Sequence, residues 1–228
     1  MSAIYPFLTP AGDAAGDARG DAARDARENA ARELVRSTAA KAADSLELRL
    51  RVLATLGPAL AACAVAMASA FRAGGTLFAF GNGGSSTDAQ AVAQLFRTPD
   101  RDGGRPWPAL PAISLTGDAA LLTALANDVA FDVVFARQLA ALGRPGDVAM
   151  ALSTSGGSVN VLRGLEQARR TGMVTVGFAG SGGGRMAEEG LAEHLFVVPS
   201  SSVHRVQEAQ TTACHVLREL VRAEPAEA

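Results

Sequence analysis

The stretch FAFGNGGSSTDAQAVAQLF, residues 78–96, joins a short apolar run, a glycine-rich turn and a helical pattern. This order is typical of the strand–loop–helix units of parallel sheets. Glycine tolerates positive φ and lets a ligand approach the backbone, and the free N–H groups of a helix start attract anions. The stretch therefore predicts an α/β fold with an anion site. An ordinary capped turn is the alternative, and the misplaced third glycine disfavours a dinucleotide-binding fold.

Short apolar runs of the same kind recur along the chain with helical segments between them, which predicts a parallel sheet covered on both faces. A long amphipathic helix is expected from Val203 to Arg222. The predicted strands are TLFAF (76–80), AISL (112–115), DVAMALS (147–153), VTVGFAG (174–180) and HLFVVP (194–199).

The N-terminal region differs from the rest of the chain. Residues 9–30 repeat small and charged residues without a large apolar side chain, so most of this segment is predicted to be disordered or fraying. Helical spacing dominates residues 31–71, with an interruption at Gly57-Pro58 that predicts two helices. The expected organisation is an extension (1–30), one domain (31–222) and a tail (223–228).

Composition excludes several classes of protein. The net charge of −2 gives no general attraction to nucleic acid. The sequence has no uninterrupted run of about 18 apolar residues, so no membrane span is expected. The N-terminus lacks the pattern of a secretory signal. Cys63 and Cys214 are interpreted as buried thiols in a reducing cytosol. The single lysine, Lys41, excludes a Walker-type phosphate loop.

The segment STSGGS, 153–158, follows a predicted strand and carries four hydroxyl side chains around two glycines. Hydroxyls and helix N–H groups can hold a phosphate without lysine, which favours a phosphate site over a simple N-cap at Ser158. The hydroxyls belong to Ser153, Thr154, Ser155 and Ser158. A third segment, GSGGGR (180–185), is interpreted as a tight loop with a solvated Arg185, with anion binding as the alternative.

Three histidines could carry chemistry. His194 precedes a strand and is interpreted as structural, and His204 opens the last helix. His215 follows Gln207 by eight residues, which is about 80° beyond two full helical turns, so both side chains can face one broad cleft. A packed helical histidine without catalytic role is the alternative.

Three segments together resemble the sugar isomerase (SIS) domain family, and within it the phosphoheptose isomerases. These segments are GNGGSSTDAQ (81–90), the run from ALAND to RRTGM (124–173) and RVQEAQTTACHVL (205–217). The resemblance implies a flavodoxin-like three-layer sandwich with a five-stranded parallel sheet, preceded by N-terminal helices. It also implies a cytoplasmic homotetramer with sites between subunits, and interconversion of sedoheptulose 7-phosphate with an aldoheptose phosphate.

The resemblance also implies roles for individual residues. Phosphate is held by Ser153, Thr154, Ser155 and Ser158. The sugar meets Asn82, Gly83, Gly84, Asn127 and Asp128. Gln207 and His215 complete the site, with His215 as the candidate catalytic group.

Two departures from the isomerase pattern put catalysis in question. After the first loop the isomerases carry a histidine and a glutamate four residues apart, which transfer protons and can join the glutamine and the late histidine around zinc. Here those positions are Ala91 and Leu95, which can do neither. The family-type zinc site is therefore expected to be incomplete, and no cofactor is expected. His204 also stands where the isomerases usually carry an acidic residue.

Three readings follow. The first is a phosphosugar-binding SIS protein with lost or altered isomerase chemistry, acting as a sensor or interaction protein with an unidentified partner. One tetrameric relative, which binds the bacterial replication initiator, shows that the scaffold tolerates such a role. The second is a divergent sugar-phosphate isomerase that uses His215 with Asp128, His204 or Glu208. The third makes the glycine loops purely structural.

Overall fold

The structure is a computed structural model that describes residues 16–99 and 108–225. The chain divides into two units between Asp44 and Ser45, and each is considered by itself. One helix, α1 (Gly16–Arg72), contributes to both.

The N-terminal unit is helical where the structure describes it. Residues 16–30 belong to α1, so the prediction that this segment is mostly disordered is wrong there, while residues 1–15 lie outside the described range. Alanine has the highest helix propensity, and charges three or four residues apart stabilise the helix surface. Glu28 lies 3.3 Å from Arg24 and 3.9 Å from Arg32 in such pairs.

The predicted break at Gly57-Pro58 is also wrong, because α1 continues through Pro58. Proline removes one backbone hydrogen bond, which here leaves the carbonyl of Ala54 without its helical donor. Ala54 and Pro58 are both exposed, so water can bind the Ala54 carbonyl. On the other side Leu60 and Met67 are fully buried, and this packing stabilises the continuous helix.

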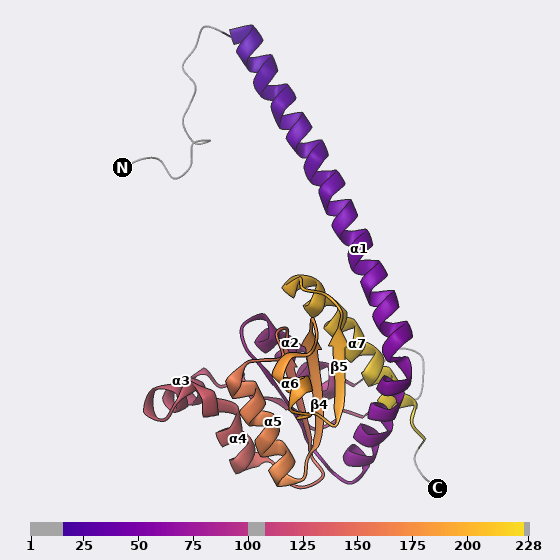
Figure 1. Cartoon of the computed structure of the whole chain (residues 1–228), viewed down its shortest axis with the longest axis vertical. Coiled ribbons are helices and arrows are strands. Elements are labelled where there is room, and N and C mark those ends of the chain that lie inside the picture. The colour runs from indigo at the N-terminus through magenta and orange to yellow at the C-terminus, as the bar shows by residue number, and fades with distance from the viewer. Residues whose placement is uncertain (1–15, 100–107, 226–228) are drawn as a thin grey trace. The chain divides into compact units, whose positions relative to one another are not determined.

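The predicted parallel sheet is confirmed. In the described part of the chain five strands pair in parallel in the order β2-β1-β3-β4-β5, the flavodoxin-like order (Figure 1). Each strand lies within two residues of its predicted limits. The strands are β1 (Leu77–Gly81), β2 (Ala112–Ser114), β3 (Val148–Ser153), β4 (Val174–Gly180) and β5 (His194–Val198).

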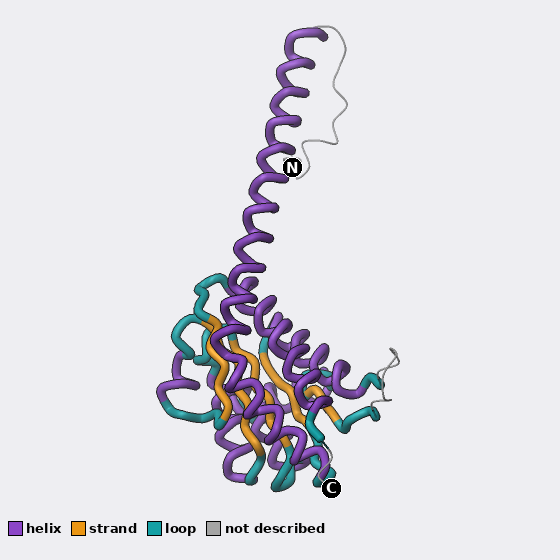
Figure 2. Tube along the Cα trace, turned by 90° about the vertical axis from the view of Figure 1, so that its right-hand side faces the viewer, coloured by secondary structure: helices purple, strands orange, loops and turns teal. Residues whose placement is uncertain are grey.

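Two apolar clusters cover the two faces of the sheet, and Figure 2 shows the strands between helices. The C-terminal part of α1, together with α2 (Gly84–Arg97) and α7 (Val203–Ala223), packs on one face. The other face is covered by α4 (Val134–Leu142) and α5 (Val159–Thr171). The remaining helical elements are α3 (Ala119–Asp128), η2 (Phe131–Val133) and α6 (Gly184–Glu188).

Both thiols lie in the first of these clusters, as predicted. Cys63 of α1 and Cys214 of α7 are free and buried. Burial raises the pKa of the Cys63 thiol to about 12 and also raises the pKa of Cys214. Neither thiol is therefore available as a thiolate near neutral pH.

By length and composition alone, the segment Ala23–Arg72 of α1 could cross a membrane, with a window of mean hydropathy 1.8. Core helices of water-soluble proteins meet the same criterion. In this helix 33% of that window is buried, and Leu60 and Met67 of α1 pack on the sheet.

Main-chain contacts join the loops after β3 and β4. The Met186 N–H donates to the Gly156 carbonyl at 2.8 Å, and the Gly180 N–H donates to Thr154 at 3.1 Å. Gly156 has a φ of +62°, and a Cβ atom there would lie 1.9 Å from the carbonyl oxygen of Gly183. The GSGGGR segment is thus a structural support for the STSGGS loop.

A substitution tests this close approach. Gly156→Ala should lower the free energy of unfolding by at least about 1–3 kcal/mol. The alanine would have to adopt a positive φ, and its Cβ atom would collide with the Gly183 carbonyl oxygen. Gly157→Ala is the matched control: its Cβ would meet nothing nearer than 3.9 Å, so its effect should stay within about 0.5 kcal/mol. Urea unfolding measures both, and equal stabilities would contradict the packing of these loops.

Candidate functional site

The STSGGS loop brings its serine hydroxyls together at the carboxyl end of β3. The Oγ atom of Ser153 lies 3.4 Å from those of Ser155 and Ser158, near the upper limit for hydrogen bonding. Ser158 directly precedes α5, yet its hydroxyl makes no capping bond. The hydroxyls and the first N–H groups of α5 therefore remain able to bind an anion.

A reciprocal amide pair joins the first glycine loop to this one. Asn82 donates to Asn160 at 2.7 Å, and Asn160 donates back at 2.8 Å. Asn160, in the first turn of α5, is only 3% exposed. Sequence reasoning named Asn82 but missed Asn160, whose one signal was a polar residue in an otherwise apolar helix start. The pair holds the loops after β1 and β3 side by side.

The start of α2 is held against α7 by a second polar contact. The amide Nε2 of Gln207 donates to Asp88 Oδ2 at 2.9 Å. A Cβ atom on Gly84 would lie 2.3 Å from that amide nitrogen, so Gly84 leaves the space that Gln207 occupies. Gly83 has a φ of +55°, which favours glycine. Asp88 was not predicted as a site residue, and no sequence signal pointed to its partner.

A cleft of about 340 Å³ lies between α2 and α7, bordered by β3. His215 lines it from α7, and Ala91 and Leu95 line it from α2. The sequence predicted that Gln207 and His215 face one cleft, and of these two only His215 is among the residues that line it. Asp88 also lines the cleft, and Gln207 contacts it by its hydrogen bond to Asp88. The other lining residues are Val92, Gln94, Thr98, Leu152, Thr211 and Cys214.

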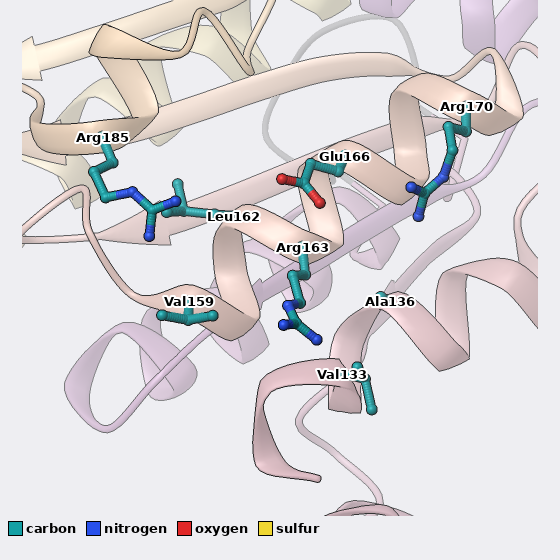
Figure 3. Close-up of a pocket in the computed structure, with 8 residues that line it drawn as sticks. All are labelled: Val133, Ala136, Val159, Leu162, Arg163, Glu166, Arg170 and Arg185. Carbon is teal, nitrogen blue, oxygen red and sulfur yellow. The ribbon is translucent and has the colours of Figure 1, made fainter. Parts of the chain in front are cut away.

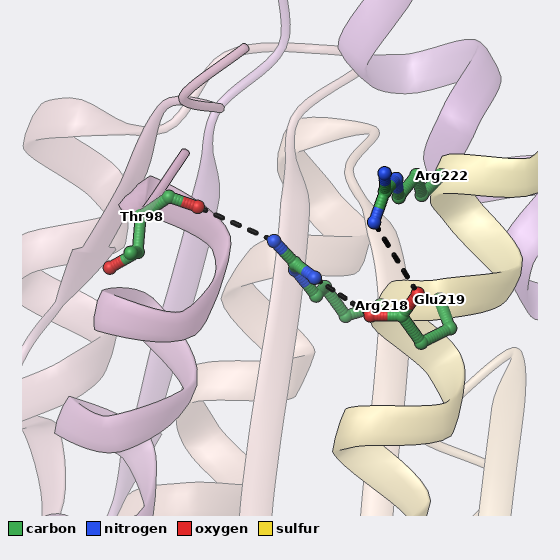
Figure 4. Close-up of polar contacts among 4 residues, drawn as sticks. All are labelled: Thr98, Arg218, Glu219 and Arg222. Atoms are coloured by element: carbon green, nitrogen blue, oxygen red, sulfur yellow. Dashed lines mark hydrogen bonds and ion pairs between the residues drawn. The ribbon is translucent and has the colours of Figure 1, made fainter. Parts of the chain in front are cut away.

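An arginine holds the far end of this cleft (Figure 4). Arg218 of α7 is 7% exposed, and its Nη2 atom donates to the carbonyl of Thr98 at 3.4 Å. Its Nη1 atom lies 2.7 Å from Glu219 Oε1, while Arg222 lies 3.9 Å from the other oxygen of Glu219. These contacts fix the end of α2 relative to α7.

The donor set of the cleft does not fit the zinc site that the resemblance implies. Ala91 and Leu95 offer no lone pair, and Gln207 is engaged with Asp88. Within residues 16–99 and 108–225, no group of three or more His, Cys, Asp or Glu side chains could hold a metal ion. We therefore derive no step through a metal.

Several predicted residues lie elsewhere. Asn127 donates to Asp128 at 2.7 Å at the exposed end of α3, and in the described part of the chain no hydrogen bond joins either to the STSGGS loop. His204 is exposed at the start of α7. Glu208 accepts from Ser45 and pairs with Arg49 at 3.4 Å. His194 lies on β5, consistent with a structural role.

A second hollow, of about 570 Å³, lies along α5 and is lined by three arginines among other residues (Figure 3). Arg163 pairs with Asp132 at 2.8 Å, and Arg185 pairs with Glu189 at 2.7 Å. Arg170 donates to a glutamine amide, and Glu166 also lines the hollow. Two of the three arginine charges are thus paired with carboxylates, and we take the α2–α7 cleft, which holds His215, Ala91 and Leu95, as the candidate for the sugar.

The burial of the Asp88 carboxyl predicts how the stability of the protein depends on pH. Burial raises its pKa, and the bond from Gln207 opposes this. A raised pKa in the folded state means that stability falls as pH rises from the usual aspartate pKa of about 3.9 through the folded value. Asp88→Asn, which can still accept from Gln207, should raise the melting temperature at pH 7.

That gain should shrink as the pH falls below about 4, where Asp88 is protonated in both states. Asp25→Asn, at an exposed position of α1, is the matched control. Melting curves between pH 3 and pH 8 measure both variants. A gain that is independent of pH would contradict the role of burial.

Comparisons with known proteins agree with this architecture. A family model described as SIS domain matches residues 40–180. The phosphoheptose isomerase of Roseiflexus sp. (strain RS-1) is 42% identical over 177 residues, 78% of this chain and 87% of that protein. The phosphoheptose isomerase of Desulfovibrio desulfuricans is 46% identical over 184 residues, 79% of this chain and 84% of that protein.

Solved structures give the same result. The phosphoheptose isomerase GmhA from Neisseria gonorrhoeae superposes with a TM-score of 0.76 at 32% identity, over 84% of this chain and all 100% of that one. A phosphoheptose isomerase from Francisella tularensis gives 0.76 at 30% identity, over 83% and 98%. The match in sequence and in sheet order shows that this chain belongs to the SIS domain family and is of the phosphoheptose isomerase type.

Proposed function

We propose that this protein binds a phosphorylated sugar without carrying out the family's sedoheptulose 7-phosphate isomerisation, and that it acts as a sensor or interaction protein. The observation that carries the proposal is a cleft lined by Ala91, Leu95 and His215, in a chain that also brings three serine hydroxyls together in the STSGGS loop.

The loop supports phosphate binding. Three serine hydroxyls converge there, and the loop ends at the start of α5, whose dipole favours negative charge. The amide pair of Asn82 and Asn160 keeps this arrangement in place before a ligand arrives. A preorganised site loses less free energy on binding.

The cleft supports the loss of isomerase chemistry. Moving a proton between adjacent carbons needs positioned acid and base groups, each typically contributing about 10²–10⁴-fold to rate. Neither Ala91 nor Leu95 can transfer a proton. Glu208, one substitute considered from sequence, is engaged by Ser45 and Arg49 on the α1 side of α7.

The first experiment is NMR of the purified protein with sedoheptulose 7-phosphate. We expect ligand-induced shifts and no aldoheptose phosphate over several hours. Product formation that persists in Leu142→Glu, at an exposed residue outside the cleft, and stops in His215→Ala would overturn the loss of chemistry. Absence of shifts with both this sugar and inorganic phosphate would overturn the phosphate site.

A gain-of-function variant tests the same claim from the other side. The double substitution Ala91→His and Leu95→Glu restores the acid–base pair on the face of α2 that lines the cleft. With zinc supplied, turnover of sedoheptulose 7-phosphate should rise by at least about 100-fold over the unmodified protein. Leu142→Glu, at an exposed residue of α4 that does not line the cleft, is the control and should leave turnover unchanged.

A second candidate, a divergent isomerase, is favoured by one observation. Asp88 is a carboxylate that lines the cleft together with His215, and burial raises its pKa. A raised pKa brings a carboxyl closer to the range in which it serves as an acid or base near neutral pH. If any sugar phosphate is turned over, Asp88→Asn and His215→Ala should each lower kcat by about 10²-fold or more.

A further inference from the structure

The α2–α7 cleft has one apolar side. Ala91 and Leu95 are four residues apart on α2 and therefore share a helix face, and Leu152 of β3 adds a third apolar group. A sugar hydroxyl placed against these side chains would lose its hydrogen bonds to water without finding a new partner. A methyl group in the same place would instead leave water favourably.

The rim next to this apolar side is polar. Asp88 uses Oδ2 to accept from Gln207, and its Oδ1 atom has no hydrogen-bond partner in the part of the chain that the structure describes. This oxygen is an acceptor for a ligand N–H group. His215 lines the cleft from the facing helix and offers a ring nitrogen to a ligand carbonyl.

The cleft and the STSGGS loop involve adjacent residues at the carboxyl end of β3. Leu152 lines the cleft, and the next residue, Ser153, begins the loop. The Asn82–Asn160 pair and the Gln207–Asp88 pair connect the loop region to the helices that form the cleft. A phosphate at the loop would therefore direct the sugar attached to it toward Ala91 and Leu95.

We infer that the ligand of this site is a phosphorylated sugar that carries an N-acetyl group. This inference rests on the proposed function, because it needs the phosphate at the STSGGS loop. The acetyl methyl packs on Ala91 and Leu95, the amide N–H donates to Asp88, and the carbonyl accepts from His215. An aldoheptose or ketoheptose phosphate has neither the methyl group nor the amide N–H.

Isothermal titration with matched ligands tests the inference. N-acetylglucosamine 6-phosphate should bind at least about tenfold more tightly than N-formylglucosamine 6-phosphate, which lacks only the methyl group. Glucose 6-phosphate, which lacks the amide as well, should bind more weakly than both. Inorganic phosphate reports on the STSGGS loop alone.

Substitutions then locate the preference. Leu95→Glu and, as a milder second variant, Ala91→Ser should each remove most of the preference for the acetyl over the formyl ligand while phosphate binding is retained. Leu142→Glu is the matched control and should keep the preference. Circular dichroism and the retained binding of phosphate verify that the variants fold.

The outcomes separate the two claims. Equal affinities for the three sugar phosphates would overturn the acetyl inference and leave the proposed function standing. No binding of any sugar phosphate or of inorganic phosphate would overturn both. A preference for the acetyl ligand that survives in both cleft variants would overturn the assignment to Ala91 and Leu95.

Discussion

The close approach of main chains at the carboxyl edge of the sheet is the constraint on which this site depends. β1 and β3 are parallel neighbours, with Gly81 paired to Leu152, so the loops that follow them must meet. Glycine at positions 84 and 156 leaves the space for Gln207 and for the Gly183 carbonyl. The Asn82–Asn160 pair then satisfies the side-chain amide of Asn160, which would otherwise be costly to bury.

The sheet and its loops were accessible from sequence because their signals are local. Each strand is a short apolar run bounded by glycine or proline, and a parallel sheet buried on both faces shows continuous rather than alternating apolar residues. The hydroxyl run of 153–158 is equally local. Helical periodicity suggested one cleft for Gln207 and His215, and the family resemblance drew attention to Ala91 and Leu95; the structure places Ala91, Leu95 and His215 around one cleft.

The sequence could not predict side-chain hydrogen bonds between residues that are far apart in the chain. Asn160 lies 78 positions from Asn82, and Asp88 lies 119 positions from Gln207. No periodic pattern encodes such partners. The prediction of a break at Pro58 failed for a related reason. Whether a helix tolerates a proline depends on whether that position faces water, which the local sequence does not reveal. In residues 16–30 the prediction of disorder underestimated the high helix propensity of alanine.

Two adjacent residues of α7 have contacts in opposite directions. Gln207 holds Asp88 of α2 at the cleft, and Glu208 holds Ser45 and Arg49 of α1. The three helices pack on the same face of the sheet, and the second turn of α7 contacts both neighbours. The segment of α7 that contacts Asp88 at the cleft is thus the same segment that contacts α1, so any substitution that shifts it would disturb contacts with both helices.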